Sequence, residues 1–363
     1  MKVVVTGGGT GGHVYPALEV ALELRRRGCE VAYVGSLRGQ ESAACAKAGV
    51  GFTGFPSEPL YRLTSLRGWR GAINLARARI MARRHLSQTR PDAVFSTGGY
   101  ASAPVVSAAS SLGVPFVLHE QNVVPGRTNR ILSKSAAAVA TTFRSGAEHF
   151  PEARVVRTGM PVRSEFRSGQ VGFGLAQQLG DAGPILLVMG GSQGAQAINE
   201  AALATAVRMA GQTVQWLHVT GTKHFPGMTE SLARLGLTSG YELRAFLQAE
   251  EMASAMFGCE IAVCRSGAGT LAELAAMRKP AILVPYPAAF ADHQRLNALE
   301  FESIGAAVLL EEKELTPAAL EARVLSWLGE ADRQASARAA LEAWDIPDAV
   351  GRIADLVQEG AAR

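Results

Sequence analysis

Short runs of apolar residues alternate with longer amphipathic stretches along almost the whole chain. The runs are rich in Val, Ile and Leu, as in parallel strands that are buried on both faces. The stretches between them carry apolar residues at helical spacing. We therefore predict strands at Lys2–Val5, Glu30–Val34, Ala93–Phe95, Phe116–Leu118, Val155–Arg157, Ile185–Val188, Val214–Val219, Leu243–Phe246, Ile261–Cys264 and Ala281–Val284.

This alternation predicts an α/β fold with a doubly wound parallel sheet in each half of the chain. The series of strands pauses at Gly159–Arg163 and then starts again. We expect an N-terminal domain over residues 1–162 and a C-terminal domain over 163–344, since 363 residues can bury two cores. The last stretch, about 345–363, is expected to be a helix that packs back on the first domain.

The composition favours a cytoplasmic enzyme. Aromatic residues make up 6% of the chain and the formal net charge is only +4, so a nucleic-acid partner has little support. The four cysteines form no CxxC pair and no zinc-like cluster, which is typical of buried thiols in a reducing compartment. The N-terminus turns to glycine after a few apolar residues and predicts a strand, not a signal peptide. Ala93–Leu118 is uncharged, but its glycines and prolines favour a strand, turn, helix and strand over a transmembrane helix.

Two glycine-rich loops stand half a chain apart, at Val3–His13 and Ile185–Gly194. Each follows an apolar run and opens a helix, so the free N–H groups of the helix start are aimed at an anion. Two such loops indicate paired Rossmann-like domains with a ligand cleft between them. The first loop matches G-x-G-x-x-G, but no acidic residue follows Val34 to hold a ribose, which disfavours a nicotinamide dinucleotide.

Polar side chains of the first half gather after predicted strands. His13 lies at a helix start, where the dipole favours a neutral ring that can accept a proton; the alternative is a histidine that only packs or caps. The run from His119 to Asn122 follows another strand, where ligands of open α/β sheets bind, although a solvated loop would look similar. Gly98–Tyr100 holds the equivalent place after a third strand and allows a close approach to the backbone.

In the second half, Ser266–Thr270 follows a strand and opens a helix that contains Glu273. Its N–H groups suit a diphosphate, and Glu273 can accept hydrogen bonds from a ribose, unless it is an ordinary solvated carboxylate. Asp292–Asn297 also lies beyond a strand and offers groups that bind sugar hydroxyls. No Asp-x-Asp occurs in the chain, so a diphosphate leaving group would be stabilised by helix N-termini and cations in place of a divalent ion.

Several segments, in order along the chain, together resemble the MurG family. They are TGGGTGGHVYPALEVA, STGGYASAP, LHEQN with PGRTNR, GMPVR, GGSQGAQAIN, CRSGAGTLAE and ADHQRLNA. The family comprises the UDP-N-acetylglucosamine:undecaprenyl-diphospho-muramoyl-pentapeptide N-acetylglucosaminyltransferases of peptidoglycan synthesis. The matches extend from Thr6 to Asn297, and their combination is specific although no single piece is.

The resemblance implies a GT-B fold, with the lipid acceptor on the N-terminal domain and the UDP-sugar on the C-terminal one. The acceptor side would include Gly98, Gly99, Tyr100 and His119. No metal and no other cofactor is implied. The implied donor contacts are Thr10, Gly11, Gly12, Asn122, Arg163, Ser192, the Leu247 backbone for uracil, Ala268, Gly269, Thr270, Leu271, Ala272, Glu273 and Gln294.

The reaction implied is an inverting, metal-independent transfer of N-acetylglucosamine. The 4-hydroxyl of the MurNAc-pentapeptide of undecaprenyl-diphosphate lipid I would attack the anomeric carbon and give β-1,4-linked lipid II. His13 is the first candidate for the base that takes the hydroxyl proton, and Glu120 is the second. The alternatives are a UDP-sugar 2-epimerase of the same architecture, a nicotinamide-dependent oxidoreductase and a non-catalytic lipid-binding module.

The segment Pro59–Pro91 carries eight arginines and no acidic residue, with apolar residues between them. We predict that it docks the protein, as a peripheral protein, on the anionic cytoplasmic face of the plasma membrane. The alternative is a solvated helix whose apolar face packs on the sheet. Proteins of cell-wall synthesis are further candidate partners.

Overall fold

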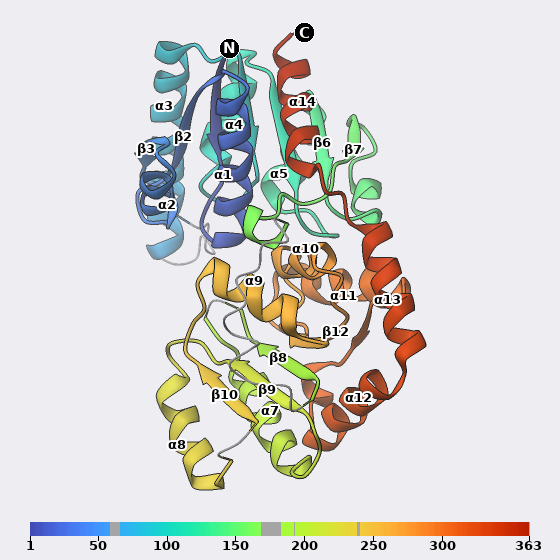
Figure 1. The fold of residues 1–363 in the computed structure, drawn as a ribbon. Helices are drawn as coiled ribbons and strands as arrows, with labels where there is room; N and C mark the ends of the chain where they lie inside the picture. Colours follow the sequence, from blue (N-terminus) through green and yellow to red (C-terminus); the bar gives the residue numbers. More distant parts are fainter. Residues whose placement is uncertain (59–65, 168–182, 192, 238–239, 363) are drawn as a thin grey trace. The chain divides into compact units, whose positions relative to one another are not determined.

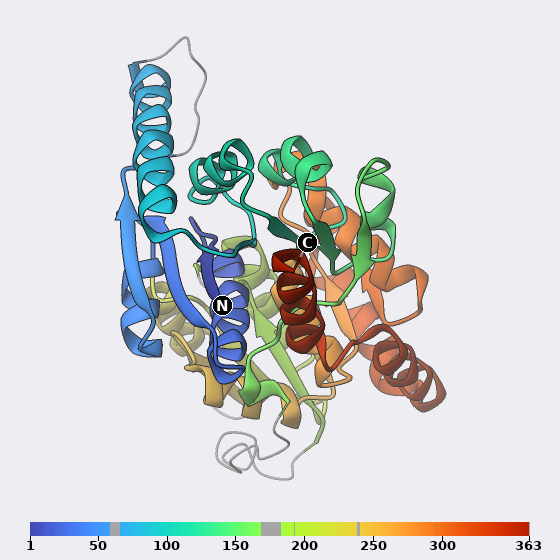
Figure 2. The same cartoon turned by 90° about the horizontal axis from the view of Figure 1, so that it is seen from above.

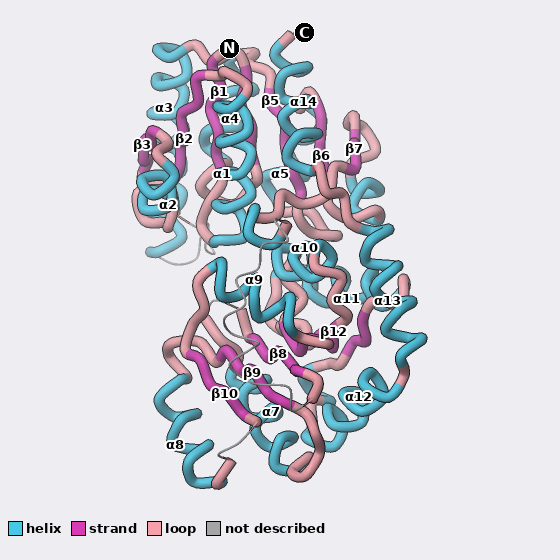
Figure 3. Tube along the Cα trace, viewed as in Figure 1, coloured by secondary structure: helices cyan, strands magenta, loops and turns pink. Residues whose placement is uncertain are grey.

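The structure is a computed structural model that describes residues 1–58, 66–167, 183–191, 193–237 and 240–362, without the side chains of residues 66 and 67. The chain forms two compact units. Unit 1 comprises Met1–Arg163 and Ile346–Arg363, and unit 2 comprises Ser164–Asp345. In each unit, parallel strands alternate with helices along the chain (Figures 1 and 3).

Within the described residues, unit 1 has a sheet of seven parallel strands in the order β3-β2-β1-β4-β5-β6-β7. The strands are β1 Lys2–Thr6, β2 Glu30–Ser36, β3 Gly51–Phe55, β4 Ala93–Ser96, β5 Phe116–Glu120, β6 Ala138–Thr141 and β7 Val155–Arg157. The helices are α1 Gly11–Arg26, α2 Glu41–Ala48, α3 Leu66–Thr89, α4 Ala103–Leu112, α5 Arg127–Leu132 and α14 Ala349–Ala361, with short 3-10 turns η1 Ser133–Ser135 and η2 Ser145–His149.

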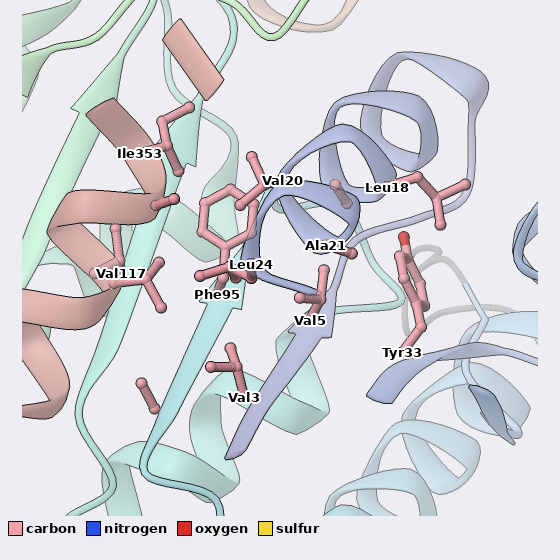
Figure 4. Packing of buried hydrophobic residues seen from close by; sticks show 14 of the residues in the cluster. Val3, Val5, Leu18, Val20, Ala21, Leu24, Tyr33, Phe95, Val117 and Ile353 are labelled. Atoms are coloured by element: carbon pink, nitrogen blue, oxygen red, sulfur yellow. The ribbon is translucent and has the colours of Figure 1, made fainter. Parts of the chain in front are cut away.

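Both faces of this sheet are covered, as its continuous apolar strands require. Val3 and Val5 of β1 point toward α1 and α14, where they pack with Leu24 and Ile353 (Figure 4). Val4, on the opposite face, belongs to the cluster beneath α3 and α4. Figure 2 separates the two layers, with α3 and α4 on one side of the strands and α1 and α14 on the other. The helix at the end of the chain therefore closes the core of unit 1.

Unit 2 has a sheet of six parallel strands in its described part, in the order β10-β9-β8-β11-β12-β13. The strands are β8 Ile185–Met189, β9 Gln215–Val219, β10 Tyr241–Arg244, β11 Ile261–Cys264, β12 Ala281–Leu283 and β13 Ala307–Leu309. The helices are α7 Gln196–Arg208, α8 Phe225–Leu235, α9 Ala249–Gly258, α10 Ala268–Ala276, α11 His293–Ser303, α12 Pro317–Gly329 and α13 Ala331–Trp344, with 3-10 turns η3 Ser164–Phe166, η4 Phe290–Asp292 and η5 Glu312–Glu314.

The two strand orders confirm the doubly wound parallel sheets expected from the sequence. The predicted strand Leu243–Phe246 is displaced to Tyr241–Arg244, because the register with β9 pairs Tyr241 with Trp216. Three strands were not predicted: β3, β6 and β13. Among the described residues, no helix is both long and apolar enough to cross a bilayer.

Candidate functional site

The glycine loop of unit 1 connects β1 to α1. Thr10 caps α1 with an extended backbone, and its side chain makes no capping hydrogen bond. A Cβ added to Gly12 would meet only the Thr10 hydroxyl, at 3.8 Å, so the backbone of the first turn is open on that side. Thr10, Gly11 and Gly12 thus offer a helix N-terminus of the kind that binds phosphate.

His13 lies in the first turn of α1, with its ring half-buried. Its Nδ1 is 2.8 Å from the carbonyl oxygen of Thr97, which can only accept a hydrogen bond. Nδ1 must therefore carry the hydrogen in the neutral ring, and Nε2 is the atom that can take a proton. The Thr97 hydroxyl donates back to the His13 carbonyl at 2.8 Å, which fastens the helix start to the end of β4.

The turn after β4 packs directly on this loop. Gly98 and Gly99 both have left-handed backbones, with φ of 86° and 82°. A Cβ on Gly99 would collide with the carbonyl of Gly8, and one on Gly9 would collide with the ring of Tyr100. The structure thus brings Gly98, Gly99 and Tyr100 together with the loop that carries His13.

His119 and Glu120 were expected just after a strand, but they form the end of β5 itself and pair with Ala140 and Thr141. His119 is fully buried. Its Nε2 donates to the carbonyl of Gly159 at 3.0 Å, and burial lowers the pKa of the ring to about 4. The imidazole is therefore neutral and holds the backbone turn at Gly159. If His119 influences binding of the acceptor substrate, it does so indirectly, by positioning the residues that surround its ring.

The Glu120 carboxylate is also buried, and backbone and amide N–H groups surround it. Oε1 accepts from Asn122 N at 3.0 Å, and Oε2 accepts from Gly126 N at 3.0 Å and from Asn129 Nδ2 at 2.9 Å. Burial raises the pKa of Glu120, and these hydrogen bonds work against that rise. The carboxylate shapes the turn that carries Asn122, a geometry that favours a structural role over that of a base.

Gln121 is a further residue of the site; the sequence analysis included it only as part of the run from His119 to Asn122. Its amide donates to the carbonyl of Thr97 at 2.7 Å, so this oxygen holds both Gln121 and His13. Its own carbonyl oxygen is buried and has no hydrogen-bond partner among the described residues. Nothing in the local sequence distinguishes Gln121 from its polar neighbours, because the contact joins two different strand ends.

Unit 2 repeats the strand, glycine loop and helix. Gly191 and Gly194 have left-handed backbones, with φ of 84° and 74°. A Cβ on Gly194 would collide with the carbonyl of Thr220 at the end of β9. Ser192 lies outside the described residues, and the cap of α7 at Ala195 makes no side-chain hydrogen bond.

A buried chain of polar side chains stands behind this loop. Asn199 donates to the carbonyl of Thr220 at 3.0 Å, and His218 lies 3.0 Å from Asn199 Oδ1 and 2.7 Å from the hydroxyl of Tyr241. Burial lowers the pKa of His218 to about 3 and raises that of Tyr241. His218 is thus a neutral link, near the end of β9, that joins the first turn of α7 to the start of β10.

The loop before α10 is open at two glycines. A Cβ on Gly267 or Gly269 would meet nothing within 4 Å, and the cap at Gly267 makes no side-chain hydrogen bond. Thr270 and Glu273 are half-buried on the first turns of α10. The side chains of Ala268, Leu271 and Ala272 are buried in the core, so these residues can reach a ligand only through their backbone.

Gln294 in the first turn of α11 is held from two sides. Its Oε1 accepts from the backbone of Tyr286 at 3.0 Å, and its carbonyl accepts from the buried hydroxyl of Ser266 at 2.7 Å. Ala291 and Asp292 before it both have left-handed backbones, with φ of 49° and 55°. This strained turn aims α11 so that Gln294 meets the loop after β12.

Arg265 is a second residue that the sequence analysis missed. Its guanidinium donates to the carbonyls of Val284 and Pro285 at 3.1 and 3.0 Å and pairs with Glu312. It therefore ties the end of β11 to the loop after β12. The sequence signal that could have identified it is an arginine directly before the loop of small residues Ser266–Thr270.

The remaining predicted contacts are Arg163 and Leu247. The Arg163 guanidinium stands 5.8 Å from the centroid of the Tyr15 ring, beside the first turns of α1. Leu247 is buried just before α9, whose start is closed by a capping box between Gln248 and Glu251. Only the backbone of Leu247 can meet a uracil. In the described part of the chain, no three His, Cys, Asp or Glu side chains are grouped as a metal site.

Two family models match the chain: the N-terminal domain of glycosyltransferase family 28 over residues 3–141, and its C-terminal domain over residues 185–353. The chain belongs to glycosyltransferase family 28. It is 37% identical, over 99% of both chains, to the UDP-N-acetylglucosamine–N-acetylmuramyl-(pentapeptide) pyrophosphoryl-undecaprenol N-acetylglucosamine transferase of Exiguobacterium. It is 35% identical, over the same shares, to transferase 2 of that name from Bacillus thuringiensis. This family 28 chain is thus a member of the MurG family, as the motifs indicated.

Solved structures agree with the fold. MurG of Acinetobacter baumannii superposes with a TM-score of 0.79 at 27% identity, with 99% of each chain covered. The UDP-GlcNAc 2-epimerase of Neisseria meningitidis reaches a TM-score of 0.71 at 13% identity over 99% of this chain and all of its own. The second likeness shows the two Rossmann-like domains and nothing about activity.

Proposed function

We propose that the protein transfers N-acetylglucosamine from UDP-N-acetylglucosamine to the 4-hydroxyl of lipid I and so makes lipid II. Relatives named for this transfer match at 35–37% identity over 99% of the chain. The observation that carries the proposal is the set of helix N-termini with open glycines in both units, together with a histidine whose hydrogen bond to Thr97 leaves Nε2 as its proton acceptor.

In this proposal, the two units bind different substrates. Unit 2 binds the donor: the N–H groups at the starts of α7 and α10 face the diphosphate, Glu273 accepts from the ribose, and Gln294 binds the transferred sugar. Unit 1 binds the acceptor beside Gly98–Tyr100. The donor contacts at Thr10–Gly12, Asn122 and Arg163 come from the loops of unit 1.

The chemical step is a single displacement with inversion. The acceptor oxygen bonds to the anomeric carbon while His13 Nε2 takes its proton, and the anomeric bond to the diphosphate breaks with its electron pair on UDP. His13 is preferred over Glu120 because three N–H groups already bind the Glu120 carboxylate. Helix N-termini and Arg163 stabilise the charge on UDP, and no metal ion is needed.

Helix α3 is proposed as the membrane-binding element. It buries Ala78, Ala82 and Leu86 against the core, while Trp69 and Ile80 are 61% and 70% exposed. Ile73 and Met81 are exposed as well, among exposed arginines. The buried face alone would also suit a solvated helix packed on the core, but a solvated helix gives no reason for the four large apolar residues on the exposed side. Contact with the anionic cytoplasmic face of the plasma membrane would account for this exposure.

The decisive experiment incubates the purified protein with labelled UDP-N-acetylglucosamine and lipid I without added metal. Label in a β-1,4-linked glycolipid, with one UDP released per sugar transferred, is the expected result. Conversion of the nucleotide sugar to its 2-epimer without any acceptor would favour the epimerase alternative instead. Binding of lipid I without turnover would reduce the protein to a lipid-binding module.

A further inference from the structure

Glu41 is a buried carboxylate in unit 1 that neither the motifs nor the proposed reaction uses. It is the first residue of α2, a position where acidic side chains are usually solvated, yet it is 0% exposed. Its Oε1 accepts a hydrogen bond from the backbone N–H of Gly9 at 3.1 Å. Burying a carboxylate is costly, so this contact needs a reason.

The backbone around Glu41 is built to admit its side chain. A Cβ on Gly8 or on Gly39 would collide with the carboxylate, and one on Gly35 would lie 3.1 Å from its Cγ. These glycines come from the loop after β1, the segment before α2 and the strand β2. Three separate backbone segments therefore close around one side chain.

The glycine loop is gripped at two points. Glu41 holds the N–H of Gly9, and the buried hydroxyl of Tyr33 donates to the carbonyl of Gly7. Gly9 has a left-handed φ of 99° and immediately precedes Thr10, the cap of α1. A shift of Gly9 would therefore move the cap and the first turn that carries His13.

We propose that Glu41 is a positioning residue whose carboxylate fixes the loop Gly7–Thr10 and, through it, His13. The inference rests on the proposed function, because His13 has its role as base there. Only Oε1 receives a hydrogen bond, and Oε2 has no partner among the described residues. We therefore expect the position of the loop to depend on two properties of Glu41: an oxygen that accepts the Gly9 N–H, and a side chain long enough to bring this oxygen to Gly9. The negative charge of the carboxylate is not required for this hydrogen bond.

Three substitutions separate the effect of side-chain length from that of charge. Glu41→Gln keeps the length and the acceptor oxygen but loses the charge. Glu41→Asp keeps the charge but is one methylene shorter, and Glu41→Ala loses both the acceptor oxygen and the charge. We expect kcat to fall about 10–100-fold in the Asp and Ala variants and less than about threefold in the Gln variant, because a small misplacement of a catalytic group is costly. The KM for the donor should rise in the same two variants, because Thr10–Gly12 are proposed donor contacts, and should stay near the wild-type value in the Gln variant. Glu30→Ala, an exposed carboxylate of the same unit, is the control.

Hydrogen exchange supplies a readout that does not depend on turnover. Backbone amides of residues 7–14 should exchange faster in the Asp and Ala variants and at the wild-type rate in the Gln variant, with the strands of unit 1 unchanged. Equal impairment of the Gln and Ala variants would overturn the inference, and so would wild-type kcat and protection in Glu41→Ala. If Ala does not fold, the Gln and Asp pair decides alone. A wild-type protein without transferase activity would refute the proposed function, while the exchange data would still test the loop.

Discussion

The two units of the molecule start alike and differ in what holds their glycine loops. In unit 1, buried side chains of Tyr33 and Glu41 grip the loop, and the next helix carries His13 in its first turn. In the described part of the unit 2 loop, the Gly194 N–H donates to the carbonyl of Gly191 at 2.9 Å, and Gly194 packs against the carbonyl of Thr220 after β9. The buried chain from Asn199 to Tyr241 supports that carbonyl from behind.

This difference fits the two tasks that the proposed reaction assigns to the units. A helix start that only binds a diphosphate needs open N–H groups and small residues, which α10 has at Gly267 and Gly269. A helix start that must also place a base needs a fixed ring orientation, and His13 has one because the Thr97 carbonyl selects its tautomer. We expect substitution of His13 to affect mainly turnover, and substitutions in the first turns of α10 to affect mainly nucleotide binding.

The largest effect is expected for His13→Ala. Turnover should fall about 10²–10⁴-fold, the usual range for an acid–base group, because the proton acceptor is lost while the glycine loop stays. UDP affinity in calorimetry should stay nearly the same. His149→Ala, an exposed histidine of the same unit, is the control. Near-normal turnover would transfer the role of base to Glu120.

Substitutions on helix α3 of unit 1 should weaken binding to membranes, whereas matched substitutions in unit 2 should not. Joint replacement of Trp69, Arg70, Arg83 and Arg84 should weaken sedimentation with anionic vesicles by about 100-fold, since each basic residue near the leaflet contributes about 1 kcal/mol. Binding of the wild type should weaken with salt and need anionic lipid.

A matched variant of unit 2 tests the location. It replaces one exposed apolar and three exposed basic residues, Leu235, Lys223, Arg234 and Lys313, and should bind vesicles like the wild type. Undiminished binding by the α3 variant would place the membrane surface elsewhere.

Glu273→Ala should weaken UDP binding by roughly 1–3 kcal/mol through lost hydrogen bonds to the ribose. The effect on kcat at saturating donor should be small, in contrast to His13. Calorimetry with UDP measures it, and Glu230→Ala on the exposed side of α8 is the control. Unchanged UDP affinity would reject the ribose contact.

The buried histidine of unit 2 should make its stability sensitive to acid. The pKa of His218 is about 3 in the folded protein and about 6.5 in an unfolded chain. Between these values the unfolded state binds a proton that the folded state does not, so stability falls as the pH falls, by up to about 1.4 kcal/mol per pH unit.

Native-state hydrogen exchange of β8 between about pH 7 and 5 measures this dependence. His218→Gln should make the slope shallower by one proton, whereas His224→Gln in the same unit should leave it unchanged. An unaltered slope in His218→Gln would mean that other groups control the acid sensitivity.

The smallest expected effect is that of a chelator. Transfer should continue in EDTA, because helix N-termini stabilise the leaving diphosphate and the chain has no Asp-x-Asp. Turnover with and without EDTA is the measurement. Complete loss, restored by magnesium or manganese, would contradict this account of both units.

The strands that carry the glycine loops could be predicted from the sequence because their signal is local. A continuous apolar run followed by glycine marks β1 and β8 without reference to any other part of the chain. The strands β3, β6 and β13 were missed, since they are short and rich in glycine, alanine or polar residues. Their strand conformation comes from pairing with neighbours, which no local pattern records.

The sequence alone determined the α/β class, the two repeats of strand, loop and helix, and His13 at a helix start. Only the tertiary structure decided which polar side chains are exposed. It buried His119 and Glu120 in β5, buried Glu41 behind the glycine loop and left Trp69 outside. The physical reason is that burial and hydrogen bonding depend on segments far apart in the chain, whereas propensity and capping depend on neighbours in sequence.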